Sequence, residues 1–445
     1  SFEPLEENGR NRYTGLLKGP TAKKLWGTQQ STVELQIDSA DDTSARVVIG
    51  GNVIELTKGM WSPILELTFK TGPFFSVRAL TRVILTETHP GVTLYVLPLQ
   101  IHPLRSPWRY AMPPSFAKRT WKNCGPYLTL GWPQDTTGLE EGCLTDRQFL
   151  DLCEGIFDTR EQILMHHLDR FNEGIIASIF DSLDRIQHMF WHSRPDVVDA
   201  WYVKLDALIG RVERKLADLG HEETRILVLS DHGFADFHHK VHLNRWLVEH
   251  GYLTPRRELE SGKLKDVDWS KSRAYALGLN SIYLNLEDRE GEGIVTSAHE
   301  EELTSEICVK LRRWRGPDGR SVVQEAWPAD ECFTGPYTAY GPDIVVGFSS
   351  GYRASSETGL GEWSSSSIEP NHDHWEADHC VAPQIVPGVL LSNTNLGPCS
   401  QPSYRDVPSL VLGKDLHQGG MAPPPRFSHE DQELVEERLR SLGYL

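Results

Sequence analysis

The sequence predicts an α/β protein in which a mostly parallel sheet lies between helices, preceded by a β-rich insert. From about residue 175 onward, short continuous apolar runs alternate with segments of helical periodicity, which is the pattern of parallel strands joined by helices. Before that point, apolar and β-branched runs are separated by Gly, Pro and Asp turns, which is typical of antiparallel strands. These two sequence patterns divide the chain into two regions.

The β-rich region comes first in the chain, and a proline-rich connector follows it. Within this region the alternation of apolar and polar residues predicts strands at residues 45–49, 64–69 and 92–97. The expected domain organisation is therefore a β-rich insert or cap with its connector over residues 1–145. Residues 146–445 are expected to form the C-terminal portion of an α/β core.

The α/β region is expected to open with a helix at residues 146–171, with Asp146 or Thr145 placed to cap its start. A short apolar run at residues 175–180 predicts a strand buried on both faces, and a long helix is expected to follow at 195–219.

The remaining elements of this region follow from the same patterns. Further core strands are expected at 225–230, 343–348 and 388–392, and helices at 243–250 and 428–445, with a surface loop at 364–367.

Composition and charge exclude several classes of protein. Of the 445 residues, 39% are hydrophobic and 24% are charged, which excludes disorder or collagen as a description of the whole chain. Lys and Arg number 45 against 62 Asp and Glu, so the net charge is −17 and the far field repels phosphates. We therefore expect no binding of nucleic acid duplexes, and any phosphate chemistry must use metal ions or a few placed cations.

The cysteines and the hydropathy bear on the compartment. The seven cysteines are widely spread and form no C-x-x-C pair, which favours reduced thiols and a cytoplasmic location. No stretch approaches 18 apolar residues, so we expect no membrane span in the visible chain.

A carboxylate and an imidazole stand four residues apart just after the first predicted core strand. One helical turn would place Asp184 and His188 on the same face, and such a pair suits a divalent ion such as zinc. The alternative is an Asp that caps the helix and a histidine that packs in the core. By itself, this spacing favours the alternative.

Two further clusters carry the same ligand types. Asp231 and His232 follow the second predicted core strand directly and precede a glycine, and three histidines lie together before the last predicted strand, at His372, His374 and His379. Ligands of open parallel sheets bind beyond the carboxyl ends of the strands. Three clusters of this kind, each at an edge of the predicted sheet, together predict a metal site.

The order of these motifs resembles the alkaline phosphatase superfamily, specifically its type I phosphodiesterase/nucleotide pyrophosphatase branch. It is similar to the bacterial and archaeal members described as predicted phosphohydrolases or phosphomutases. The similarity runs through nearly the whole chain and implies an alkaline-phosphatase-like fold. The residues that carry it are 184–191, 230–234, 243–247, 378–380, 386–390 and 442–445.

The resemblance implies two divalent metal ions, zinc in the first place, with manganese and iron as alternatives. Asp184, His188 and His379 would hold one ion, His379 being preferred over the two earlier histidines because it stands in the family's Asp-His-Cys context. Asp231 and His232 would hold the other ion, together with an earlier Asp and a nucleophilic Thr or Ser.

These last two residues are expected to lie outside this chain, so no catalytic residue is assigned. In the family they follow the first core strand, and nothing before Asp146 reads as a buried strand that ends in Asp ahead of a helix opened by Thr or Ser. Residues 135–137 offer an Asp followed by two Thr, but we interpret them as a loop. The N-terminal part of the core is therefore expected to be missing.

The resemblance implies a metal-dependent phosphoric ester hydrolase that acts on a small phosphate ester, with nucleotides among the candidates. Two alternatives stay open. The chain could be a non-catalytic or fragmentary metal-binding protein of the same fold, which the missing nucleophile favours. It could also be a phosphomutase, which shares the metal ligands. Nothing in the sequence indicates the oligomeric state.

Overall fold

The computed structural model describes residues 3–8, 11–23, 28–39, 41–72, 75–106, 109–257, 260–335, 337–396 and 402–413. The chain forms two compact units. The first unit comprises Ser1–Thr224 and His232–Pro387, and the second comprises Arg225–Asp231 and Gly388–Leu445. The helix expected at 428–445 lies outside the described residues.

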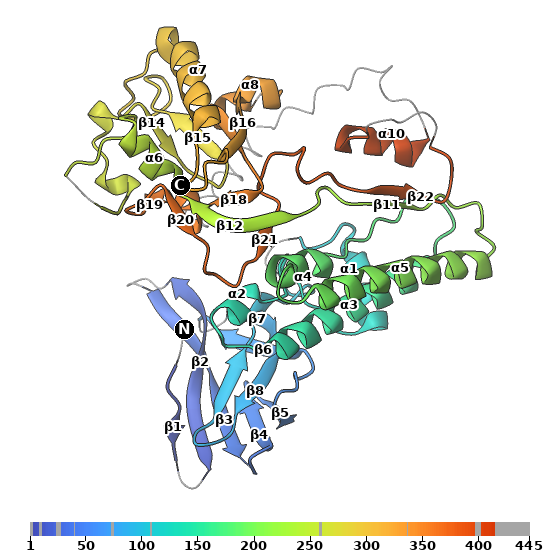
Figure 1. The fold of residues 1–445 in the computed structure, drawn as a ribbon. Coiled ribbons are helices and arrows are strands. Elements are labelled where there is room, and N and C mark those ends of the chain that lie inside the picture. The colour runs from blue at the N-terminus through green and yellow to red at the C-terminus, as the bar shows by residue number, and fades with distance from the viewer. Residues whose placement is uncertain are drawn as a thin grey trace. The chain divides into compact units, whose positions relative to one another are not determined.

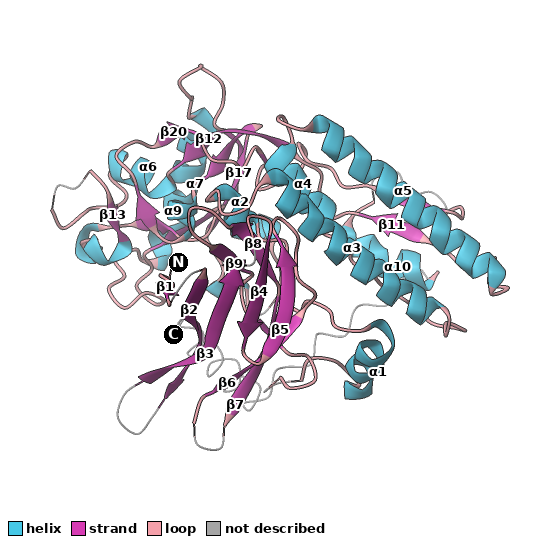
Figure 2. Cartoon of the chain, turned by 90° about the horizontal axis from the view of Figure 1, so that it is seen from below, coloured by secondary structure: helices cyan, strands magenta, loops and turns pink. Residues whose placement is uncertain are grey.

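The β-rich part of the first unit is antiparallel, as its alternating sequence predicts (Figure 2). A five-stranded sheet runs in the order β1 (Glu6–Glu7), β2 (Arg12–Lys23), β3 (Thr28–Ser39), β4 (Ser44–Ile49) and β5 (Asn52–Thr57). Smaller sheets are formed by β6 (Leu65–Lys70), β7 (Ser76–Thr81) and β10 (Gln100–Ile101), and by β8 (Val83–Glu87) and β9 (Thr93–Val96). The inward faces of β3, β4 and β6 share one apolar core. The three strands predicted in this region are confirmed.

Helices follow the β-rich part: α1 (Pro114–Cys124), α2 (Thr136–Glu140), α3 (Asp146–Leu168), α4 (Ser182–Phe190) and α5 (Pro195–Asp218). In both views α3, α4 and α5 lie side by side (Figures 1 and 2), and they share a core that includes Phe157, Met189 and Trp201. Thr145 caps α3 in a reciprocal capping box with Gln148, which explains the sharp start of the helix. The predicted long helices are confirmed.

The rest of the first unit packs around a second, larger core. β12 (Ala235–Val241) pairs in parallel with β18 (Gly351–Ala354) and antiparallel with β20 (Ile368–Pro370) and β21 (Ala377–Asp378). An antiparallel sheet has the order β14 (Ala274–Ala276), β15 (Ser281–Leu284), β17 (Ile344–Phe348) and β16 (Val323–Pro328). The other elements are α6 (Leu243–Glu249), β13 (Gly262–Lys263), α7 (Ser297–Arg313), α8 (Ala329–Cys332), α9 (Ser356–Gly359) and β19 (Glu362–Trp363).

The second unit contains an antiparallel pair, β11 (Leu227–Leu229) with β22 (Leu390–Ser392), and the short helix α10 (Val407–Leu412). Strands are therefore present where two core strands were predicted. They are not buried on both faces, since Leu229 is 47% exposed and Leu391 is 58% exposed.

The strand predicted at residues 175–180 is wrong. The segment has no regular secondary structure, no described segment pairs with it, and Ile175 and Ile179 are 61% and 78% exposed. A strand needs a hydrogen-bonded neighbour, and here the Ile179 carbonyl accepts instead from the Arg160 guanidinium. An apolar run shows that a segment can enter a sheet, but it does not supply the partner strand.

Two further expectations need correction. The mostly parallel sheet is not confirmed, because β12 and β18 form the one parallel pair among the strands that the structure describes. Residues 135–137 are not a loop: Asp135 accepts a hydrogen bond from the Gly138 amide and caps α2, which opens at Thr136. An Asp followed by Thr is a helix-start signal in its own right.

Within the described part of the chain, no helix is long and apolar enough to cross a bilayer. The six cysteines found there are free thiols: Cys124, Cys143, Cys153, Cys308, Cys332 and Cys380.

Candidate metal centre

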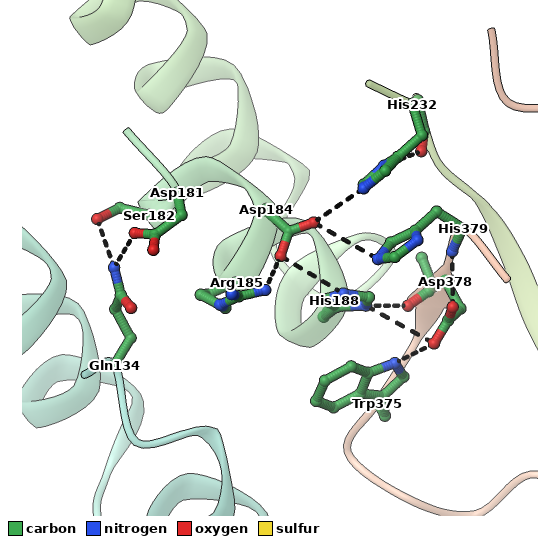
Figure 3. A network of polar contacts seen from close by, with 12 residues as sticks. Gln134, Asp181, Ser182, Asp184, Arg185, His188, His232, Trp375, Asp378 and His379 are labelled. Carbon is green, nitrogen blue, oxygen red and sulfur yellow. Dashed lines mark hydrogen bonds and ion pairs between the residues drawn. The ribbon is translucent and has the colours of Figure 1, made fainter. Parts of the chain in front are cut away.

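The site is built on α4, which carries Asp184 and His188 one turn apart. His188 Nε2 lies 3.6 Å from Asp184 Oδ2, as the spacing of the two residues predicts. His188 Nδ1 lies 2.8 Å from the carbonyl oxygen of Ala377, which can only accept, so Nδ1 carries the proton. The lone pair of the neutral ring is therefore on Nε2, the atom that faces Asp184 (Figure 3).

Three aromatic rings surround the His188 imidazole. Its ring centroid lies 4.1 Å from that of Trp375, 4.8 Å from that of Phe234 and 6.3 Å from that of Trp132. This burial lowers the pKa of His188 to about 3, although Asp378 partly opposes the shift. The ring is therefore neutral at physiological pH, which is the form that binds metals.

Two more imidazoles face the same carboxylate. The rings of His232 and His379 are stacked with their centroids 3.6 Å apart, and their Nε2 atoms lie 3.9 Å and 3.7 Å from Asp184 Oδ1 (Figure 3). His232 Nδ1 lies 3.0 Å from the Gly233 carbonyl, so it also donates to the backbone. The fold thus gathers three imidazoles around one carboxylate from three distant parts of the sequence.

The atoms that converge here fit a divalent cation. Asp184 Oδ1 and His188 Nε2 are buried without a hydrogen-bond partner, which is costly unless something positive satisfies them. Ligand atoms of Asp184, His188 and His379 all lie within 4.8 Å of one another. Bonds of about 2.0 Å in a tetrahedral zinc site place ligand atoms about 3.3 Å apart. The separations of Asp184 from His188 and from His379, 3.6 and 3.7 Å, are slightly wider.

A cation from the chain partly compensates Asp184. The Arg185 guanidinium pairs with Asp184 Oδ2 and lies over the Trp132 ring. Burial raises the pKa of Asp184, while Arg185 and His232 oppose that rise. Burial likewise lowers the pKa of Arg185, and Asp184 opposes that shift.

Asp378 stands behind the histidines and orients them. Its Oδ1 accepts from the backbone amides of His379 and Cys380 at 2.7 and 2.8 Å. Its Oδ2 accepts from Trp375 Nε1 at 2.8 Å and forms an ion pair with Arg353 Nε at 2.7 Å. Burial alone would raise the pKa of Asp378, but Arg353 and the neighbouring His188 outweigh it and hold that pKa well below its usual range. We read Asp378 as a charged positioning residue.

The N-terminal end of α4 is fixed by a separate network, drawn in Figure 3. Gln134 Nε2 donates to Asp181 Oδ1 at 2.7 Å and to Ser182 Oγ at 3.0 Å, and Arg160 on α3 pairs with the same aspartate. These contacts hold the first turn of the helix that presents Asp184. Sequence reasoning missed them, since Gln134 carries no local signal of such a role.

The other predicted ligands are placed as follows. Asp231 is the last residue of the first segment of the second unit, whereas His232 begins the returning segment of the first unit. The role of Asp231 as a ligand therefore stays a prediction. Of the two histidines that were not preferred, His372 is exposed, and His374 Nε2 lies 4.0 Å from Asp146 at the start of α3.

Arg353 is a residue that the sequence did not reveal. It lies on β18, 25 positions before its partner Asp378, and a lone arginine in a strand gives no sign of a buried acidic partner. Trp375 has a weak signal, since it stands within the histidine-rich cluster.

Comparison with known proteins gives one match. A family model described as type I phosphodiesterase/nucleotide pyrophosphatase matches residues 54–357. The matched span contains Asp184, His188, Asp231 and His232, and it ends before His379. Neither the search of curated proteins nor that of solved structures returns a match.

Proposed function

Because the chain belongs to the type I phosphodiesterase/nucleotide pyrophosphatase family, we propose that it is a metal-dependent hydrolase of small phosphate esters that uses two divalent ions. The observation that carries this proposal is the convergence of three imidazoles on Asp184, with two buried ligand atoms left without hydrogen bonds. Buried unsatisfied acceptors are rare in proteins. Here they sit among ligand types that suit zinc.

In this proposal Asp184, His188 and His379 hold one ion, and Asp231 and His232 hold the other, with zinc preferred over manganese or iron. When bound, such ions act as Lewis acids that polarise a phosphoryl oxygen and activate a hydroxyl or water. The chain's part is to keep the ligands deprotonated and oriented. The Ala377 carbonyl fixes the tautomer of His188, and Asp378 fixes the backbone that carries His379.

The charge of the chain fits this assignment. A net charge of −17 repels phosphate esters at long range. The bound ions would be the largest local charges and reverse that field inside the site. Arg185, which lies beside Asp184, adds one further positive charge there. We assign no nucleophile to a residue of this chain.

The proposal is tested by metal content and by hydrolysis. The full chain is loaded with zinc, manganese or iron, dialysed, and assayed with bis(4-nitrophenyl) phosphate and 4-nitrophenyl phosphate. We expect up to two ions bound at the candidate centre and metal-dependent release of nitrophenol. Asp184→Asn and His379→Ala should lower both the metal content and the rate of hydrolysis, because each substitution removes a metal ligand.

His372→Ala is the matched control, since His372 is an exposed histidine of the same cluster. It should change neither metal content nor hydrolysis. The metal assignment is overturned if the metal-replete protein holds no ion, or if the ligand variants hold as much as the parent. Full metal binding without hydrolysis of either ester would overturn the catalytic part and favour a metal-binding protein of this family.

A further inference from the structure

A second group of metal-ligating side chains lies at the other end of α4. His192 follows the helix closely, and Asp236 and His238 are alternate residues of β12. His192 Nε2 lies 3.3 Å from Asp236 Oδ1, and His238 Nε2 lies 3.7 Å from Asp236 Oδ2. The two imidazole rings are stacked, with their centroids 5.7 Å apart. None of these residues belongs to the ligand set proposed above.

The backbone places these side chains together on the outer face of β12. Ala235 and Phe237 point into the protein and are buried, whereas Asp236 is half-buried and His238 is exposed. The pairing of β12 with β18 shifts register between Phe237 and His239, so the strand is irregular at His238. The distance of 3.7 Å between His238 Nε2 and Asp236 Oδ2 shows that both ligands of β12 reach the same side. There they meet His192 beyond the end of α4.

Neighbouring groups hold the cluster in position. Trp191 Nε1 donates to Asp236 Oδ1 at 3.1 Å, which orients the carboxylate. Glu376 Oε2 accepts from the backbone amides of His192 and Ser193 at 2.6 and 2.9 Å, which fixes the segment that carries the first histidine. Outer hydrogen bonds of this kind orient the ligands in protein metal sites.

We propose that His192, Asp236 and His238 bind a divalent transition-metal ion of the zinc class. Two imidazoles and one carboxylate are a ligand set that zinc accepts. The ligand atoms all lie within 4.8 Å of one another. The two His–Asp separations of 3.3 and 3.7 Å are close to the separation of about 3.3 Å between ligand atoms of a tetrahedral zinc site. The side chains of His192 and His238 are 49% and 55% exposed, so solvent can complete the coordination.

An ion at this place would join the C-terminal end of α4 to β12. Both elements also carry or flank the candidate centre, because α4 presents Asp184 and His188, and His232 lies just before β12. The competing explanation is that Asp236 only forms ion pairs with two protonated histidines. That arrangement is an ordinary surface interaction, worth little stability.

The test is zinc stoichiometry in the full chain at slightly alkaline pH, where free imidazoles are neutral. The double variant His192→Ala/His238→Ala should bind one equivalent less than the parent. Asp236→Asn keeps a hydrogen-bond acceptor for Trp191 but removes the anionic ligand, and it should weaken the same equivalent. His299→Ala/His372→Ala removes two exposed histidines elsewhere and should change nothing.

A second measurement separates this site from the candidate centre. In the Asp184→Asn background, the equivalent that depends on His192 and His238 should persist. Cobalt(II) substitution should give visible absorption bands, and the part of that absorption that comes from this site should be lost in the double variant and reduced in Asp236→Asn. Unchanged zinc stoichiometry in His192→Ala/His238→Ala would overturn the proposal, as would an equal loss in the control. If the candidate centre fails to bind metal while this equivalent remains, the proposed function falls and this inference stands.

Discussion

Arg353 Nε lies 2.7 Å from Asp378 Oδ2, and the side chains are 14% and 2% exposed. The ion pair joins β18 to β21 and sits directly behind the histidines of the candidate metal centre. Burying such a pair takes both charged groups out of water, which costs desolvation free energy. Removing one partner then leaves the other charge buried and uncompensated. The pair is therefore both a structural element and a support for His379.

Asp378→Ala should destabilise the fold strongly. It leaves the Arg353 charge without its partner and removes the hydrogen-bond acceptor of the His379 and Cys380 amides. Breaking a buried pair costs about 3–5 kcal/mol. Loss of a residue that orients a ligand lowers metal affinity about 10–100-fold. Denaturant unfolding and zinc titration measure the two effects.

Asp378→Asn is the milder companion variant. Its side-chain oxygen can still accept from the amides, so stability and zinc affinity should fall less than in Asp378→Ala. If both variants bind zinc as tightly as the parent, Asp378 does not position His379.

Gly233→Ala should disturb the approach of His232 to Asp184. A Cβ at position 233 would lie 2.9 Å from the carbonyl oxygen of Pro387, which is backbone and cannot simply rotate away. Overpacking of this kind costs about 1–3 kcal/mol. It should also weaken metal binding, since His232 Nδ1 is bonded to the Gly233 carbonyl.

Gly291→Ala is the matched control, because its Cβ would meet nothing within 4 Å. Its unfolding midpoint and zinc affinity should stay at the parent's values. If Gly233→Ala has the same unfolding midpoint and zinc affinity as the parent, the backbone at Pro387 can shift without loss of stability.

The stability of the protein should fall in mild acid partly through His242. This side chain is 2% exposed, and burial lowers its pKa, although Glu369 partly opposes the shift. The unfolded chain takes up a proton at its ordinary pKa of about 6.5, while the folded chain resists protonation. Stability is therefore fully present above that pH and is lost as the pH falls toward the folded-state pKa.

One such proton changes the free energy of unfolding by at most about 1.4 kcal/mol per pH unit. His242→Gln should show a shallower loss of stability between neutral pH and mild acid than the parent, as measured by denaturant unfolding at each pH. His372→Gln, at an exposed position, is the control. Parallel pH profiles for the His242→Gln variant and the parent would contradict the prediction.

Thr145→Ala should destabilise the start of α3. The Thr145 hydroxyl accepts from the Gln148 amide, and the Gln148 side chain accepts from the Thr145 amide. Replacing an N-cap hydroxyl by Ala costs about 0.5–2 kcal/mol. The change is read as a lower unfolding midpoint, and Thr145→Ser should retain most of the parent's stability. Equal midpoints for the Ala and Ser variants would rule out this role for the hydroxyl.

The helices were the most predictable part of the fold. The starts of α3 and α5 and the end of α6 follow from residues within one or two turns, such as Thr145 ahead of α3 and Gly251 after α6. The strands were less predictable. The run at 175–180 has the composition of a core strand, yet it is exposed, because pairing depends on a second segment that the run itself does not specify.

In the candidate site, too, local features were predictable from the sequence and contacts between distant residues were not. The sequence by itself placed Asp184 and His188 on one helical face, since their spacing is a local property of an α-helix. His379 was already preferred over His372 and His374 because of its Asp-His-Cys context. Only the tertiary structure decided that it faces Asp184 together with His232. It also paired Arg353 with Asp378 and brought His192 to Asp236. These contacts join residues far apart in the chain, and their distances are set by how the helices and strands pack.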